Sequence, residues 1–250
     1  MTPTAELVFA PAADGRTALR SARVRAPLAF TRAFFADDRP PTTVAWLQST
    51  NGALRSGEEI AVRIVVERGG QVRVSPQSAT VVLGALDVRP ARLSTELVVE
   101  RDAQVVWAPQ PTIMLPGARL EAATSVHAEE SATVVLGEIF AQHLPSDACR
   151  RDGQLGTCTD VDVGGRVAAD RSEVSGPWPW PAHAAVWLLG GPSEMAGTLL
   201  DAGFAAGALP NGAGTAVRFV GSSGAVDRDV ADVVTRMHLA TTGRAAGLRS

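Results

Sequence analysis

The residues best suited to acid–base, nucleophilic or metal chemistry are few and scattered along this chain. Four histidines, His127, His143, His183 and His238, include no His-Glu-x-x-His pair of the kind that holds zinc on a helix. No lysine occurs, which excludes Schiff-base chemistry and the Gly-Lys-Ser/Thr motif of phosphate-binding loops. No Gly-x-Ser-x-Gly turn exposes a serine nucleophile. The sequence nominates no catalytic residue, so we expect no enzymatic activity.

One group of residues could supply soft metal ligands, namely His143, Cys149 and Cys158. Their spacing matches no structural zinc pattern, which favours two reduced thiols and a surface histidine.

The 26 acidic residues leave a carboxylate-dependent hydrolase open as an alternative. That chemistry requires two acids roughly 5–9.5 Å apart in a cleft.

Charge and composition limit the partners and the compartment. The net charge of −3 with scattered arginines gives no electrostatic footprint for nucleic acid. The first residues lack the basic and apolar segments of a signal peptide, and no run approaches the ~18 apolar residues of a membrane span. We therefore expect a cytoplasmic protein with no membrane partner.

Most of the chain has the alternating pattern of short β-strands. Asp14-Gly15 predicts a hairpin near the N-terminus. Residues 59–67 alternate between apolar and polar, and Gly69-Gly70 predicts a hairpin with the strand at 72–74. The same reasoning predicts a hairpin over 97–107. The sequence therefore indicates a mainly β protein.

The last third changes character. Residues 148–180 are rich in Gly, Asp and Pro and predict a loop with one strand at about 161–167. Apolar residues at helical spacing then predict a short helix at 195–200 and an amphipathic helix at 226–237, with a strand at 216–220 between them. No long linker is visible, so we expect a single domain over residues 1–250.

An internal repetition has two explanations. Ser-Ala-Thr-Val-Val-Leu-Gly occurs at 78–84 and again at 131–137. Equivalent strands in a stacked architecture produce such repeats. Chance similarity between two β-rich segments explains it equally well, because the match ends after seven residues.

The most specific segment is Pro109-Gln110-Pro111-Thr112-Ile113. Two prolines fix the backbone on both sides of Gln110 and hold its amide on a stiff, extended corner. The segment resembles the Pro-Gln-Pro-Thr-Ile motif of the UreD/UreH family of urease accessory proteins. Further segments resemble that family in the same order. They are Asp14–Thr17, Ala26–Leu28, Asn51-Gly52, Ser56–Glu58, Ser75–Thr80 and Val217–Gly221. The resemblance therefore covers roughly residues 14–240.

Some positions depart from the family pattern and indicate a divergent member. Val81 stands where the family usually has lysine, Glu58 replaces an aspartate, and Asn51 replaces a glycine. The general role therefore transfers better than any single polar residue.

The resemblance implies a β-solenoid-like (β-helical) stack of short strands with two helices near the C-terminus. It implies a chaperone of metallocentre assembly that acts with UreF and the GTPase UreG on apo-urease, and through which nickel passes. No resident cofactor is expected, since nickel is only in transit. The absence of a Cys/His cage fits this role, because strong ligands would trap the ion.

Weak oxygen donors and the proline corner are the candidates for lining the nickel route or contacting partners. These residues are Glu58, Gln77, Thr80, Pro109, Gln110, Pro111 and Glu138. The competing hypotheses are a β-rich protein-interaction module with an unrelated partner and the carboxylate-dependent hydrolase.

Overall fold

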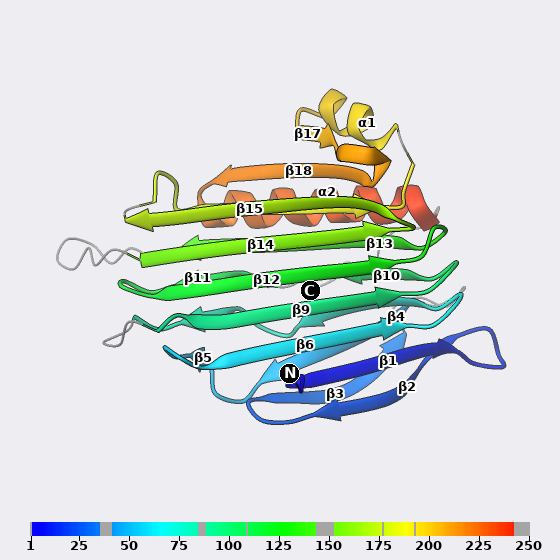
Figure 1. The fold of residues 1–250 in the computed structure, drawn as a ribbon, viewed down its shortest axis with the longest axis horizontal. Helices are drawn as coiled ribbons and strands as arrows, with labels where there is room; N and C mark the ends of the chain where they lie inside the picture. Colours follow the sequence, from blue (N-terminus) through cyan, green and yellow to red (C-terminus); the bar gives the residue numbers. More distant parts are fainter. Residues whose placement is uncertain are drawn as a thin grey trace.

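Two facing β-sheets run the length of the molecule, with their strands stacked in successive turns (Figure 1). The structure is a computed structural model and describes residues 2–35, 42–84, 89–108, 110–143, 153–176, 178–192 and 194–242. Among these residues the first sheet has seven strands in the order β15-β14-β12-β9-β6-β1-β2. The second has eleven, with the main path β17-β18-β16-β13-β10-β7-β4-β3, while β5, β8 and β11 lie off that path.

The elements follow one another along the chain with these bounds. They are β1 (Ala5–Pro11), β2 (Thr17–Val24), β3 (Leu28–Phe35), β4 (Thr43–Ser49), β5 (Ala53–Leu54), β6 (Glu59–Val66), β7 (Gln71–Pro76), β8 (Thr80–Val82), β9 (Ala91–Val99), β10 (Gln104–Trp107), β11 (Thr112–Met114), β12 (Arg119–Ala128), β13 (Thr133–Gln142), β14 (Gly153–Val163), β15 (Arg166–Gly176), β16 (Ala182–Leu189), α1 (Met195–Asp201), β17 (Ala205–Ala208), a 3-10 turn (Pro210–Gly212), β18 (Gly214–Gly221) and α2 (Ser223–Thr242).

Parallel pairing of successive turns makes this a solenoid. In the first sheet β6, β9, β12 and β14 pair in parallel, and in the second β7, β10 and β13 do the same. The chain crosses from one sheet to the other in each of about three turns. The expected β-solenoid with two helices near the C-terminus is thus confirmed.

Two predicted hairpins are wrong, because their strands lie in different sheets. β6 pairs with β1 and β9, whereas β7 pairs with β4 and β10. Gly69, with φ of 74°, therefore turns the chain from one sheet to the other and not back on itself. The link between β9 and β10 behaves in the same way. Alternation and turn residues specify strands and a reversal but not the partner strand. The hairpin at Asp14-Gly15 is confirmed by the antiparallel β1–β2 pair.

The predicted loop at 148–180 is wrong for residues 153–176, and the single strand expected at about 161–167 falls instead on the turn between two longer strands. Residues 153–176 form β14 and β15, an antiparallel pair joined at Gly164-Gly165. Threonines in place of larger apolar residues weaken the alternation there. In the structure Thr159 and Val161 nevertheless face the interior, and both are buried.

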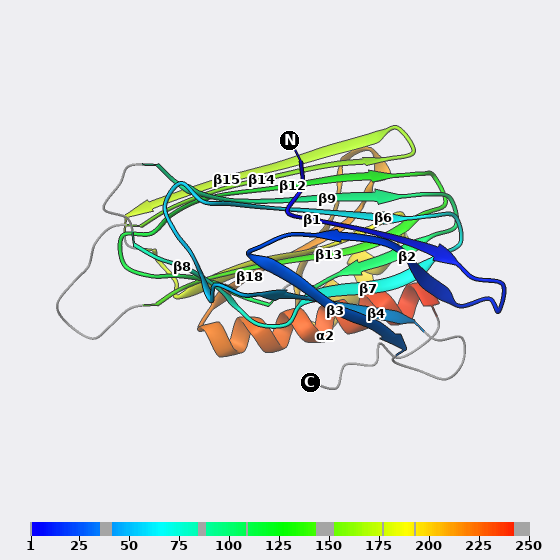
Figure 2. The same ribbon diagram turned by 90° about the horizontal axis from the view of Figure 1, so that it is seen from below.

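Both predicted helices are confirmed. α2 places Val226, Val230, Val233 and Val234 against the outer surface of the second sheet, where they form an apolar cluster with residues of β13, β16 and β18. Figure 2 shows α2 along that outer side, away from the first sheet. Neither of the two helices among the described residues therefore enters the space between the sheets. Within the described residues, no helix combines the length and apolarity needed to cross a membrane.

The repeated heptapeptide does not mark equivalent positions. Thr80 lies opposite Thr112, and Thr112 opposite Phe140, whereas Thr133 lies opposite Gln104. The two copies therefore occupy different parts of their turns, which favours chance similarity. The connection that carries Gln77 is instead stacked on the connection that carries Gln110, since Thr80 lies opposite Thr112.

Candidate functional site

The second sheet is interrupted where the proline segments lie. β7 and β10 end, and the chain resumes pairing at β8 and β11 after the residues that carry Gln77 and Gln110. β13 runs through without a break, with Leu136 opposite Trp107 and Phe140 opposite Thr112. Glu138 therefore lies on β13 beside the interruption, next to the connection that contains Gln110.

A cavity of about 100 Å³ lies between the two sheets at this level. Its walls combine apolar side chains such as Leu47, Ile60 and Leu93 with hydroxyl groups from both sheets. Among its described lining residues Glu138 carries the only charge. Gln110 is exposed to solvent and also lines the cavity, so the cavity reaches the surface beside it. We call this space the interior cavity.

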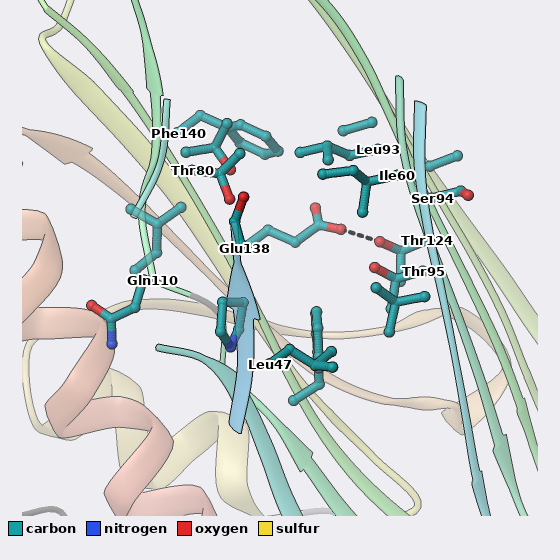
Figure 3. Close-up of a pocket in the computed structure, with 18 of the residues that line it drawn as sticks. Leu47, Ile60, Thr80, Leu93, Ser94, Thr95, Gln110, Thr124, Glu138 and Phe140 are labelled. Carbon is teal, nitrogen blue, oxygen red and sulfur yellow. Dashed lines mark hydrogen bonds between the residues drawn. The ribbon is translucent and has the colours of Figure 1, made fainter. Parts of the chain in front are cut away.

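Glu138 extends from β13 across the cavity toward the first sheet (Figure 3). The Thr124 hydroxyl donates to Glu138 Oε1 at 2.5 Å, and the Thr159 hydroxyl lies 3.5 Å from both carboxylate oxygens. Thr95, Thr124 and Thr159 are in register on β9, β12 and β14. Sheet stacking thus places a column of hydroxyl groups opposite the carboxylate.

Burial raises the pKa of Glu138 to about 7, despite the opposing hydrogen bond from Thr124. The nearby Asp170 carboxylate raises this pKa further, whereas Thr159 and the Arg218 guanidinium lower it. The carboxyl group of Glu138 is surrounded by protein. The side chain is nevertheless only partly buried, because it borders the cavity. At neutral pH the group is therefore divided between its neutral and charged forms.

An ion pair between Asp170 and Arg218 lies next to this carboxylate and joins the two sheets. Asp170 on β15 lies opposite Thr159. Arg218 on β18 is linked to Glu138 through Ala185, which lies opposite both. Both charged side chains are partly exposed. The interior therefore has a polar boundary on the side of the β15 and β18 strands.

Three predicted site residues, Thr80, Gln110 and Glu138, meet at the interior cavity. Figure 3 shows the Gln110 amide pointing away from Glu138, toward the outside of the cavity. The Pro111 carbonyl accepts a hydrogen bond from the Thr80 amide at 3.0 Å and so joins two successive connections. Pro109 lies outside the described residues.

The structure places Glu58 and Gln77 away from the cavity lining. Glu58 Oε2 accepts from the Arg55 amide at 2.8 Å and so stabilises the turn before β6. Gln77 is exposed, and its backbone N–H donates to the Leu47 carbonyl at 2.7 Å. Both residues have local structural roles in this arrangement.

Thr124, Thr159, Asp170 and Arg218 surround the carboxylate but were not singled out from the sequence. Thr124 did carry a signal, because it is a polar residue on the apolar face of the alternating segment Leu120–Val126. Thr159 and Asp170 lay in the segment predicted as loop. Arg218 looks like any exposed strand residue until the register is known.

Metal-binding clusters of three or more His, Cys, Asp or Glu residues do not occur in the described part of the chain. The Cys158 thiol lies 3.4 Å from Asp160 Oδ2, and burial raises its pKa. Cys149 lies outside the described residues. Because Glu138 is the only carboxylate among the described residues lining the cavity, the acid pair of the hydrolase hypothesis is not found there.

Comparisons with known proteins agree on one family. The family model described as UreD urease accessory protein matches residues 2–249. Urease accessory protein UreD 1 of Methylorubrum extorquens (strain PA1) is 32% identical over 98% of this chain and 90% of that relative. Its counterpart from Methylorubrum populi is 32% identical over 88% of this chain and 81% of the relative. Urease accessory protein UreD of Mycolicibacterium smegmatis is 29% identical over 88% of this chain and 84% of the relative.

The match spans nearly the whole chain, and it includes both the stacked strands and the connection that carries Gln110. The chain therefore belongs to the UreD family of urease accessory proteins.

Proposed function

We propose that this protein assists nickel incorporation into apo-urease, as a cytoplasmic scaffold and nickel conduit in a complex with UreF and UreG. It does so without catalysing a reaction. Nickel is its cargo and crosses the space between the two sheets. The observation that carries this proposal is the single carboxylate, Glu138, held inside a cavity that reaches the surface at Gln110.

The donor set of the cavity suits an ion that must leave again. Hydroxyl and amide oxygens are weak ligands for nickel, and one carboxylate supplies charge without completing a coordination shell. Thr124 and Thr159 position that carboxylate. A cation entering beside Gln110 would therefore be attracted by the carboxylate but bound weakly enough to leave.

The second sheet and its helix supply a scaffold on which partners can assemble. α2 covers the outer surface of β13, the strand that carries Glu138. Binding of a partner on that side would therefore act on the cavity wall through one strand. Co-purification of apo-urease with this protein discriminates the proposal from an interaction module with an unrelated partner.

Complementation of a deletion strain tests the conduit. In a urease-positive host lacking this gene, we compare the wild-type protein with Glu138→Gln, Gln110→Ala and Gln77→Ala. Gln77 occupies the stacked connection one turn earlier and lies outside the described cavity lining, so it is the matched control for Gln110.

We expect Glu138→Gln to lose most urease activation, because the amide keeps the shape and removes the charge. Gln110→Ala should slow activation, and Gln77→Ala should match the wild type. Urease activity is measured with the soluble level of each variant. Full activation by Glu138→Gln at a normal protein level would refute a conduit through this cavity.

A further inference from the structure

His183 occupies an interior position immediately beyond Glu138. It lies on β16 directly opposite Phe140, which lines the interior cavity. Glu138 precedes Phe140 by two residues on the same face of β13, so Glu138 and His183 are diagonal neighbours. Diagonal neighbours in an antiparallel pair are about 7–8 Å apart, within reach of long side chains.

The imidazole is held firmly but leaves one nitrogen without a partner. The Phe140 ring stacks on it at 5.4 Å between centroids, and the Trp178 ring lies 5.2 Å away. Nε2 is buried and has no hydrogen-bond partner in the described part of the chain. Buried polar atoms are nearly always satisfied, so an unsatisfied one indicates a missing ligand, ion or water.

Two more unsatisfied atoms belong to the same region. Gln142 Oε1, on the same face of β13 two residues beyond Phe140, and Nε1 of the buried Trp178 are both buried without a partner among the described residues. An imidazole nitrogen and an amide oxygen are ligands for a cation, whereas an indole N–H donates to a water on that cation. The three side chains therefore carry the kinds of polar atom that a hydrated cation contacts.

The charge state of His183 agrees with a ligand role. Burial lowers the pKa of His183, and the positive charge of Arg218 lowers it further. The neutral imidazole is the form that binds transition metals. Arg218 also opposes a resident cation, which favours passage over storage.

We propose that His183 Nε2 is a transient ligand for the divalent cation just beyond Glu138, and that it gives the interior its preference for nickel over magnesium and calcium. This inference rests on the proposed function as a nickel conduit. Carboxylate and hydroxyl oxygens suit magnesium and calcium well, so they cannot exclude these ions by themselves. An imidazole nitrogen suits nickel and binds the harder ions poorly.

Metal titrations of purified full-length protein test the assignment. Nickel and magnesium binding are measured by calorimetry for the wild type, His183→Phe and His143→Phe. Phenylalanine preserves the ring stack at position 183, and exposed His143 is the matched control. We expect His183→Phe to lower nickel affinity roughly tenfold or more without changing magnesium affinity. The His143→Phe protein should bind both ions like the wild type. Equal nickel affinity of His183→Phe and the wild type would overturn the assignment.

A second measurement covers the case in which His183→Phe does not fold. X-ray absorption of nickel bound to a His127→Phe/His143→Phe/His238→Leu triple variant should show imidazole scattering, because His183 is then the one histidine left of the four. A spectrum with oxygen ligands alone would contradict the proposal. Both readouts are independent of urease activation. Loss of activation in Glu138→Gln together with unchanged nickel binding in His183→Phe would sink this inference and leave the conduit standing.

Discussion

Glu138 is a carboxyl group kept inside the protein, where a charge is costly. Moving a carboxylate from water into the interior raises its free energy unless hydrogen bonds or countercharges compensate. Thr124 compensates in part, and Arg218 opposes the effect of Asp170. The remaining penalty raises the pKa to about 7. A cation near this group would favour the charged form and would therefore lower this pKa.

The raised pKa predicts how stability depends on pH. Between pH 4.5 and about 7 the native protein holds a proton on Glu138 that the unfolded chain has already released. The contribution of this group to the free energy of unfolding should therefore fall as pH rises through that window and level off above it. The full loss is on the order of 3 kcal/mol. Urea unfolding of the wild type and Glu138→Gln, measured from pH 5 to 8, isolates this contribution.

Glu138→Gln should gain stability relative to the wild type as pH rises, because its amide does not titrate. Glu130→Gln, at an exposed position on the turn before β13, is the control and should follow the wild type. Parallel pH curves for Glu138→Gln and the wild type would show that the carboxyl group has an ordinary pKa.

Arg218 should weaken cation binding, because its positive charge lies near both Glu138 and His183. Arg218→Gln should therefore raise nickel affinity several-fold, as expected for removal of one nearby like charge. Arg171→Gln is the control, since Arg171 pairs with Asp160 at 2.7 Å on exposed side chains of β15 and β14. The nickel affinity of both variants is measured by calorimetry. An unchanged nickel affinity of Arg218→Gln would contradict an electrostatic effect of Arg218 on cation binding.

At the level of elements, the sequence predicted strands and helices well and their partners poorly. Alternation at 59–67 specified β6, and helical spacing specified α2, because both patterns record which face is buried. Gly69-Gly70 specified a reversal but not its direction, since hairpins and inter-sheet turns use the same residues. This limit also affected the site. The sequence identified Glu138 and Gln110 as candidates, but Thr159 and Asp170 were missed because they lie in the segment predicted as a loop.

The turn between β14 and β15 places two consecutive glycines, Gly164 and Gly165, at positive φ. Gly164 has φ of 56°, and a Cβ there would come 2.9 Å from the Glu130 Cα. Gly165 has φ of 82° but open space around it. Gly164→Ala should lower the free energy of unfolding by about 1–3 kcal/mol, and Gly165→Ala by less, because only the first adds a clash to the strain. Thermal or urea unfolding of both variants tests this, and an equal loss would show that the turn relaxes freely.

The whole molecule is a short parallel stack closed by antiparallel strands. β1 pairs with β2 at one end of the first sheet, and β14 pairs with β15 at the other. Solenoids need such terminal elements, because an open stack invites further strands to add. Closure leaves an interior bounded by two sheets, with Glu138 between the cavity and the Asp170–Arg218 pair. The proposed function requires that nickel crosses this interior.

A larger side chain in the interior cavity should block this passage. Ala122 lines the cavity from β12, and Ser125 on the same strand faces the opposite side of the sheet. We compare Ala122→Leu with Ser125→Leu by measuring nickel per urease in enzyme purified from cells that contain equal amounts of each folded variant. We expect several-fold less nickel with Ala122→Leu and a normal content with Ser125→Leu. Normal nickel content in urease matured by folded Ala122→Leu would contradict passage through the interior.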